Sequence, residues 1–148
     1  MAKLTTSNAP VKAESVLTST SDSGLKEKVG GNFSIEASTK NAHIRLGFES
    51  APINSELRVN TRTAMGPAEV QLHPTFQGGF DLKTTLGRVK VEDRSGAEDP
   101  EGKDRKRVVE MDKVTGNRAY GSVYWDEEQK GLGQITVETV LGPVSLIL

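Results

Sequence analysis

The chain of 148 residues contains no cysteine. This absence excludes disulfide bonds, thiolate zinc sites, iron–sulfur clusters and a thiol nucleophile. Histidine is also scarce: His43 and His73 are the only two, and neither lies at the spacing of a metal ligand set. No G-x-S-x-G motif is there to present a nucleophilic serine. We therefore expect no catalytic residues, no metal site and no cofactor.

The chain also lacks an excess of either charge and any long apolar run. Nineteen basic and twenty acidic residues give a net charge of −1. A nearly neutral chain does not attract polyanions in general, so we expect no nucleic-acid partner. No apolar run approaches the roughly 18–20 residues that span a bilayer, and no signal peptide is recognisable. We expect no membrane span; the compartment stays open, with the cytoplasm slightly favoured.

One short pattern occurs five times and indicates how the chain is built. It consists of Thr, two variable positions, Gly or Ala, and two apolar residues at alternate places. Gly adopts left-handed backbone angles readily, and Asn8 and Asn41 are the next best residues for such a position. We therefore expect a strand that ends at the Thr, a tight turn at the small residue, and a second strand. The copies are Thr6–Ala9–Val11–Ala13, Thr39–Ala42–Ile44–Leu46, Thr63–Gly66–Ala68–Val70, Thr84–Gly87–Val89–Val91 and Thr139–Gly142–Val144–Leu146.

Apolar and polar residues alternate in almost every apolar stretch, which is typical of half-buried strands. The alternation predicts a single all-β domain over residues 1–148, with about ten to twelve strands. The architecture is either an irregular β-solenoid-like stack or a two-layer β-sandwich of strand–turn–strand repeats. Two flexible loops are expected at about residues 18–30 and 93–107. The expected strand pairs are residues 2–17, 32–48, 56–72, 79–93, 106–125 and 133–148.

Five motifs of the second half follow one another in an order that is moderately specific: FQGGF (76–80), TTLG (84–87), DPEGKDRKR (99–107), GSVYW (121–125) and VETVLGPV (137–144). Together they resemble an uncharacterised fungal domain, found mostly in mushroom-forming species and classed as a domain of unknown function. The resemblance covers about residues 30–148. It implies an all-β fold and supplies no catalytic residues. The repeats are also similar to those of bacterial adhesin-type β proteins.

The aromatic residues near position 120 are the first candidates for a binding face. Alternation places Val123 and Trp125 on one side of a strand and Tyr120 and Tyr124 on the other. We expect Trp125 to anchor the core, which leaves the two tyrosines outside. Exposed aromatic rings can stack on sugar rings or contact a partner protein. Ordinary surface packing remains the alternative.

A charged loop offers a second candidate. Its cations could hold a phosphate group or an acidic partner, and its carboxylates could bind calcium. A solvated loop in which the two signs balance is the alternative. The cations are Lys103, Arg105, Lys106 and Arg107, and the carboxylates are Asp93, Glu98, Asp99 and Glu101.

Two classes of function remain open. The first is a non-enzymatic binding or adhesion module that recognises a glycan or a protein near Tyr120 and Tyr124. The second is an enzyme whose active site lies in the loop 93–107; a purely structural or assembly role is the default. Strand edges left open could also pair two copies of the chain. We expect the apolar segment Val144–Leu148 to pair either inside the domain or across such a contact.

Overall fold

The computed structural model describes residues 2–17, 31–94 and 96–148, so the loop expected at 18–30 lies outside the described residues. Within them the fold is all-β, as the alternation predicts, with one short 3-10 turn, Glu127–Gln129. The strands are β1 (Ala2–Thr5), β2 (Val11–Val16), β3 (Asn32–Thr39), β4 (Ile44–Ser50), β5 (Glu56–Thr63), β6 (Ala68–Gln71), β7 (Gly78–Thr84), β8 (Val89–Glu92), β9 (Val108–Val114), β10 (Arg118–Tyr124), β11 (Gly133–Thr139) and β12 (Val144–Ile147).

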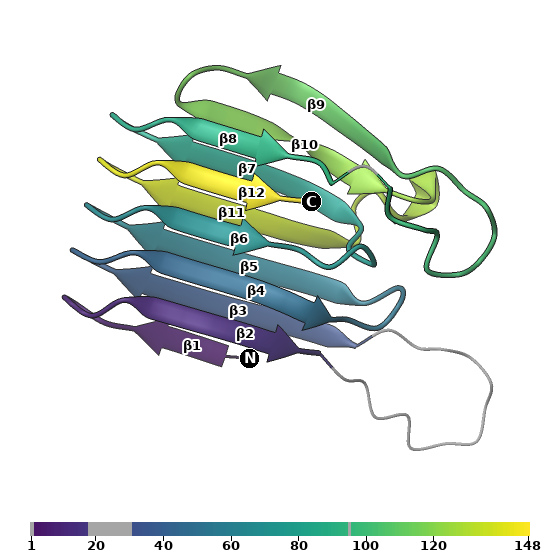
Figure 1. Ribbon diagram of the computed structural model, residues 1–148, viewed down its shortest axis with the longest axis horizontal. Helices are drawn as coiled ribbons and strands as arrows, with labels where there is room; N and C mark the ends of the chain where they lie inside the picture. The colour runs from purple at the N-terminus through teal and green to yellow at the C-terminus, as the bar shows by residue number, and fades with distance from the viewer. Residues whose placement is uncertain (1, 18–30, 95) are drawn as a thin grey trace.

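The strands form two facing sheets (Figure 1). The larger sheet has the order β1-β3-β5-β11-β7-β10-β9, and the smaller has the order β2-β4-β6-β12-β8. Each copy of the repeat is an arch: its first strand lies in the larger sheet, and its second strand lies in the smaller one. Arches that are neighbours in space pair in parallel in both sheets, whereas β9 and β10 form an antiparallel hairpin beside β7.

The order of the arches in space differs from their order in the chain. The last arch, β11–β12, lies between β5–β6 and β7–β8 and pairs in parallel with both. The apolar segment Val144–Leu148 is therefore not an edge. Its strand β12 is a central member of the smaller sheet, so it pairs inside the domain, which was the first of the two expected alternatives.

The repeated Thr and small residues mark the turns, but the expected reason for the glycines is wrong. Thr39, Thr63, Thr84 and Thr139 end their strands, and none of the glycines three places later has a left-handed φ. The turns instead approach one another so closely that a side chain does not fit. A Cβ on Gly66 would lie 2.1 Å from the carbonyl oxygen of Ala42, one on Gly142 would lie 2.0 Å from that of Gly66, and one on Gly87 would lie 2.2 Å from that of Gly142.

The asparagines of the first two turns are likewise not left-handed. Among the described residues other than glycine, only Asn54 and Asp104 have positive φ. The side chains of Asn41 and Asn8 pair across adjacent turns, with Asn41 Nδ2 2.6 Å from Asn8 Oδ1. These two residues thus join neighbouring arches rather than shape the backbone of each turn.

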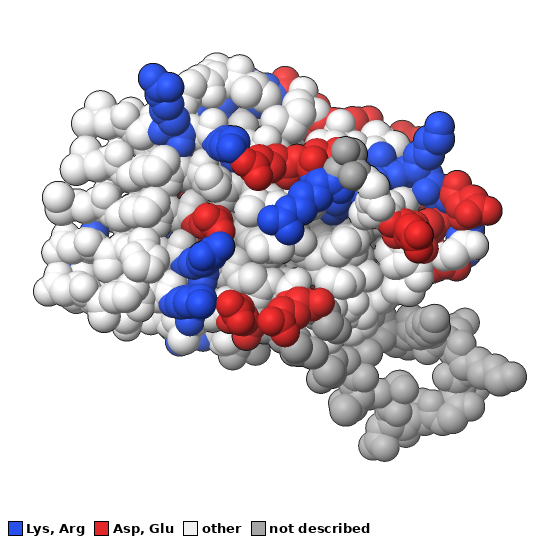
Figure 2. Space-filling view, viewed as in Figure 1, with Lys and Arg blue, Asp and Glu red and all other residues white. Residues whose placement is uncertain are grey.

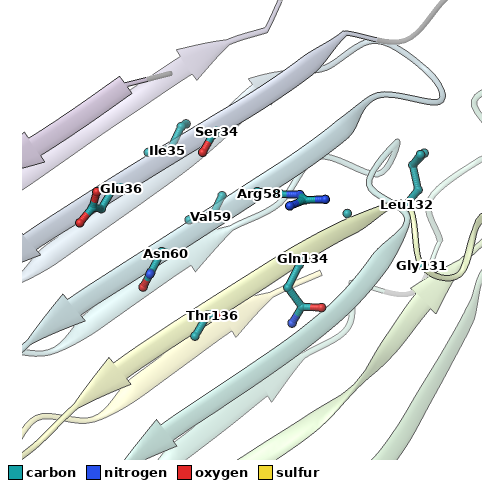
Figure 3. A pocket seen from close by; sticks show the side chains of 11 residues that line it. Ser34, Ile35, Glu36, Arg58, Val59, Asn60, Gly131, Leu132, Gln134 and Thr136 are labelled. Atoms are coloured by element: carbon teal, nitrogen blue, oxygen red, sulfur yellow. The ribbon is translucent and has the colours of Figure 1, made fainter.

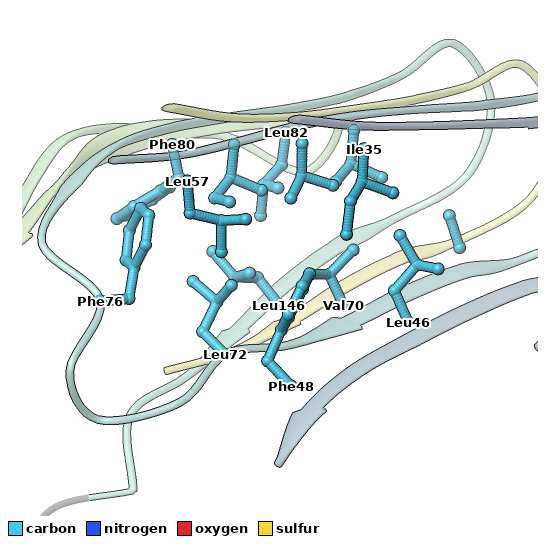
Figure 4. Close-up of a cluster of buried hydrophobic side chains, with 14 of the residues drawn as sticks. Ile35, Leu46, Phe48, Leu57, Val70, Leu72, Phe76, Phe80, Leu82 and Leu146 are labelled. Carbon is cyan, nitrogen blue, oxygen red and sulfur yellow. The ribbon is translucent and has the colours of Figure 1, made fainter. Parts of the chain in front are cut away.

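The core lies between the sheets (Figure 4) and contains the residues that alternation points inward. Apolar residues of the alternating stretches, such as Ile35, Phe80 and Ile135, are buried there. Trp125 is buried as expected, and its indole N–H donates to the carbonyl oxygen of Pro74 at 2.8 Å. The residues labelled in Figure 4 are Ile35, Leu46, Phe48, Leu57, Val70, Leu72, Phe76, Phe80, Leu82 and Leu146.

A substitution at one turn tests the close approach of the arches. We expect Gly142→Ala to lower the free energy of unfolding by about 3 kcal/mol, because the new methyl group meets the backbone of the neighbouring turn. Gly116→Ala is the matched control, since no described atom lies within 4 Å of its Cβ position. Denaturant unfolding measures both variants. Equal midpoints for the two would contradict the close approach.

Deletion of the last four residues tests the central position of β12. Removing Ser145–Leu148 exposes strand edges on β6 and β8 and empties the site of the fully buried Leu146. We expect this variant to lose its cooperative thermal transition in circular dichroism. Deletion of residues 2–5 removes an exposed edge strand of the same length and should keep the transition. A stable, cooperative fold after the first deletion would show that β12 is dispensable.

Candidate functional site

The loop 93–107 is organised by an internal ion pair. Arg105 donates two hydrogen bonds to the carboxylate of Asp99, from Nε at 2.8 Å and from Nη2 at 2.9 Å. The backbone N–H groups of Glu101 and Arg105 also donate to Asp99. These bonds, above all those from Arg105, hold the pKa of Asp99 far below its usual range, and the Asp99 carboxylate in turn raises the pKa of Arg105. Asp99 and Arg105 therefore hold the loop together and are not free to bind calcium or phosphate.

The other cations of the loop do not converge on one site. Lys103 pairs with Glu101 at 3.1 Å, while Lys106 is exposed and pairs with no described carboxylate. Among the described residues, no group of three or more His, Asp and Glu is arranged to hold a metal ion. Lys103 and Arg105 share Glu101 as a partner, whereas Lys106 is exposed, so the four cations do not form one anion site.

Arg107 is the unusual member of this loop. Its side chain is only 8% exposed, and its three guanidinium nitrogens have no hydrogen-bond partner among the described residues. The nearest carboxylate oxygen, Oδ1 of Asp93, lies 3.9 Å from Nη1. Burial lowers the pKa of Arg107, and burial together with the charge of Arg107 lowers the pKa of His73. His73 accepts a hydrogen bond at Nδ1 from the backbone N–H of Thr75, which also favours the neutral ring.

The two tyrosines are on the outer face, but they are not equally exposed. Tyr120 is half-buried, and the guanidinium of Arg118 lies 5.2 Å from its ring centre. Tyr124 is only 8% exposed, so the expectation of an exposed ring is wrong for this residue. Its hydroxyl donates to Glu110 at 2.7 Å, and the Lys130 ammonium lies 5.6 Å from its ring centre. Of the two tyrosines, only Tyr120 remains as a candidate for ligand contact.

The structure reveals a polar surface that the sequence did not single out. It lies on the outer face of the larger sheet, over β3, β5 and β11, and encloses a depression of about 490 Å³ (Figure 3). Two rows of side chains cross these strands, because residues that are paired in register lie side by side. The inner row is Glu36, Asn60 and Thr136, and the outer row is Ser34, Arg58 and Gln134.

The inner row continues beyond the depression. Thr136 is in register with Asp81 of β7, and Asp81 is in register with Tyr120 of β10. One line of acid, amide, hydroxyl, acid and aromatic groups therefore crosses five strands, spaced at about 4.8 Å. Asp81 also accepts hydrogen bonds from Arg118, at 2.9 and 3.2 Å. This ion pair fixes one end of the row.

The middle of the row has unused hydrogen-bonding capacity. The side chains of Asn60 and Thr136 make no hydrogen bond to any described residue, and Asn60 is exposed. Glu36 lies 3.4 Å from Lys3, and Arg58 lies 2.5 Å from Glu56, so the charges around them are paired. The depression thus offers an amide and a hydroxyl between neutralised charges.

A signal for this surface exists in the sequence. The residues of the inner row from the arches all lie three places before the repeated Thr, and those of the outer row lie five places before it. If the five copies are aligned in sequence at the repeated Thr, the residues of each row fall in the same column. The copies do not reveal which arch neighbours which, because the last one is inserted between two earlier ones.

Comparisons with known proteins do not assign this chain to a family. No family model matches it, and no curated protein matches it. A search of solved structures aligns 99% of the chain with 92% of a putative cell adhesion protein from Clostridium sporogenes, at 11% identity and a TM-score of 0.46. This similarity is too low to assign a family, so the resemblance to the fungal domain stays a prediction. Within the described residues, no helix has the length and apolar character needed to cross a bilayer.

The environment of Arg107 generates a prediction about stability. A buried charge without hydrogen bonds is costly, and Met retains the apolar stem while removing the charge. We expect Arg107→Met to keep or raise the free energy of unfolding, by about 1 kcal/mol. Arg105→Met should instead lower the melting temperature, because it leaves the almost fully covered Asp99 carboxylate without its partner. Thermal unfolding of both variants is the measurement, and a lower melting temperature for Arg107→Met would contradict this assignment.

Proposed function

We propose that this protein is a non-enzymatic binding module that recognises an oligosaccharide on the outer face of its larger sheet. The observation that carries the proposal is the aligned inner row, Glu36, Asn60, Thr136, Asp81 and Tyr120, whose first three members line a depression of about 490 Å³. A sugar chain presents hydroxyl groups at short, regular intervals along its length. Amide, hydroxyl and carboxylate groups at strand spacing can bind such a chain through several hydrogen bonds at once.

The chemistry of the face favours a glycan over a protein. Cores of protein interfaces are enriched in aromatic residues, Met and Arg and depleted in other charged residues. Tyr120 is the only aromatic residue in the row, and its ring stands at one end beside Arg118. Stacking of one sugar ring at that end and hydrogen bonds along the rest of the row suit a hydroxyl-rich ligand.

The charged loop supports an enzymatic role less well. Asp99 is bonded to Arg105, and Glu101 to Lys103 and Arg105, so these carboxylates have partners already. General acid–base catalysis needs a proton donor or acceptor within hydrogen-bond reach of the substrate, and carboxylates already bonded to Lys and Arg are poorly suited to this role. We therefore propose binding rather than catalysis.

A glycan array tests the proposal, followed by affinity measurements on any sugar that it identifies. We expect Asn60→Ala with Thr136→Ala to weaken binding about thirtyfold, which corresponds to two hydrogen bonds of about 1 kcal/mol each. Both side chains lack described partners, so the melting temperature should not change. Gln71→Ala, on the outer face of the smaller sheet, is the matched control and should bind as the unaltered protein does.

Two outcomes would overturn the proposal. One is an array on which the folded protein binds no sugar. The other is a bound sugar whose affinity is the same for the double variant and for Gln71→Ala. Capture of a protein ligand through the same row would redirect the function to protein recognition.

A further inference from the structure

The turns of the five arches form a straight edge along one side of the molecule, here called the arch edge (residues 6–10, 39–43, 63–67, 84–88 and 139–143; Figure 1). Backbone hydrogen bonds hold neighbouring turns in line. The variable positions after each Thr therefore project side by side from this edge. The bonds run from the N–H of Met65 to Lys40 at 3.0 Å, from that of Leu141 to Ala64 at 2.9 Å and from that of Leu86 to Val140 at 2.8 Å.

In three adjacent arches, five of the six variable positions are apolar; the sixth is Thr85. Eight large hydrophobic side chains are exposed among the described residues, and four of them belong to the arch edge. A fifth, Val114, precedes the hairpin turn whose carbonyl oxygens accept hydrogen bonds from backbone N–H groups of the arch of β7–β8. Exposed apolar residues that gather in one place indicate an interaction surface. The exposed fractions are Met65 58%, Leu86 74%, Val140 46%, Leu141 45% and Val114 61%.

The charge of the arch edge has one sign. None of its turns contains Asp or Glu, although the chain has twenty acidic residues, and the hairpin turn 114–117 contains none. Figure 2 accordingly shows the turns at the left as almost entirely white and free of red. Lys40 and Arg88 lie within the edge. Both are exposed, and neither is within ion-pair distance of a described carboxylate.

We propose that the arch edge docks on the surface of a membrane that contains anionic phospholipids. Apolar side chains on projecting turns enter the boundary between headgroups and acyl chains, and unpaired cations beside them attract anionic headgroups. The absence of carboxylates removes the repulsion that such a surface would otherwise meet. A straight edge also lets adjacent turns reach a planar surface together.

Docking in this way leaves the polar face free. The arch strands of the larger sheet run toward the arch edge and those of the smaller sheet run away from it, so both sheets stand upright on the membrane when the turns contact it (Figure 1). The inner row lies on the side of the upright larger sheet and remains open to the solvent. The membrane contact and the proposed sugar contact therefore use different surfaces and can be tested separately.

Vesicle co-sedimentation tests the proposal with the full chain. We expect the protein to bind phosphatidylcholine vesicles that contain about 30 mol% phosphatidylserine at about 0.1 M salt. Binding should fall at least about tenfold on pure phosphatidylcholine or at about 0.5 M salt, because the attraction is screened. Met65→Ser with Leu86→Ser should lower binding at least about tenfold as well. Leu4→Ser with Met111→Ser is the matched control, since both residues are exposed but lie off the edge.

A charge variant adds a second, independent comparison. Lys40→Glu places a carboxylate on the edge and should weaken binding to anionic vesicles, whereas Lys106→Glu, an exposed and unpaired cation of the loop, should not. Melting temperatures establish that each variant is folded. Failure of the unaltered protein to bind the anionic vesicles overturns the proposal, and so does equal binding by the edge variants and their controls. Self-association that the Met65 and Leu86 substitutions abolish, without vesicle binding, would assign the edge to a second copy of the chain instead.

Discussion

The fold depends on the close contact between the turn of one arch and the turn of the next. Gly66, Gly142 and Gly87 bring the backbones so near that no side chain fits between them. Buried Thr hydroxyls bond to the carbonyl groups in the same place: Thr63 donates to Ala42, and Thr84 to Gly142, each at 3.0 Å. These contacts fix the register of both sheets at once, because each turn joins a strand of one sheet to a strand of the other.

Because the register is fixed, residues at the same position of the repeat lie side by side on neighbouring strands and form rows on the surface. In the four arches after the first, positions two and four places before the Thr face the core, and those three and five places before it face the solvent. The core rows are mostly apolar in every arch, whereas the outer rows differ from arch to arch. The fold can therefore change its surface chemistry, as it does between Glu36 and Asn60, without changing its packing. The turn positions vary in the same way, from polar in Asn41 to apolar in Met65.

Much of the fold could be predicted from the sequence, because alternation reports directly on burial. The strand pairs around Thr39, Thr63 and Thr139 agree closely with the arches. The partners of each strand could not be predicted, since parallel pairing between distant arches leaves no local pattern, and the position of β11 between β5 and β7 is an example. The covering of Tyr124 by Glu110 and Lys130 also depends on contacts across the chain. Charge alone did not distinguish Arg105, which is paired, from Arg107, which is buried without a hydrogen bond.

The inserted position of β11–β12 affects how the chain reaches its native state. As the polypeptide leaves the ribosome, β5–β6 and β7–β8 appear first, yet neither is the native neighbour of the other. They must remain apart, or separate again, until residues 133–147 have been synthesised and can enter between them. Contacts between segments so far apart in sequence slow folding and leave strand edges open meanwhile. Nascent chains of this protein should therefore remain sensitive to proteases until synthesis has passed β12.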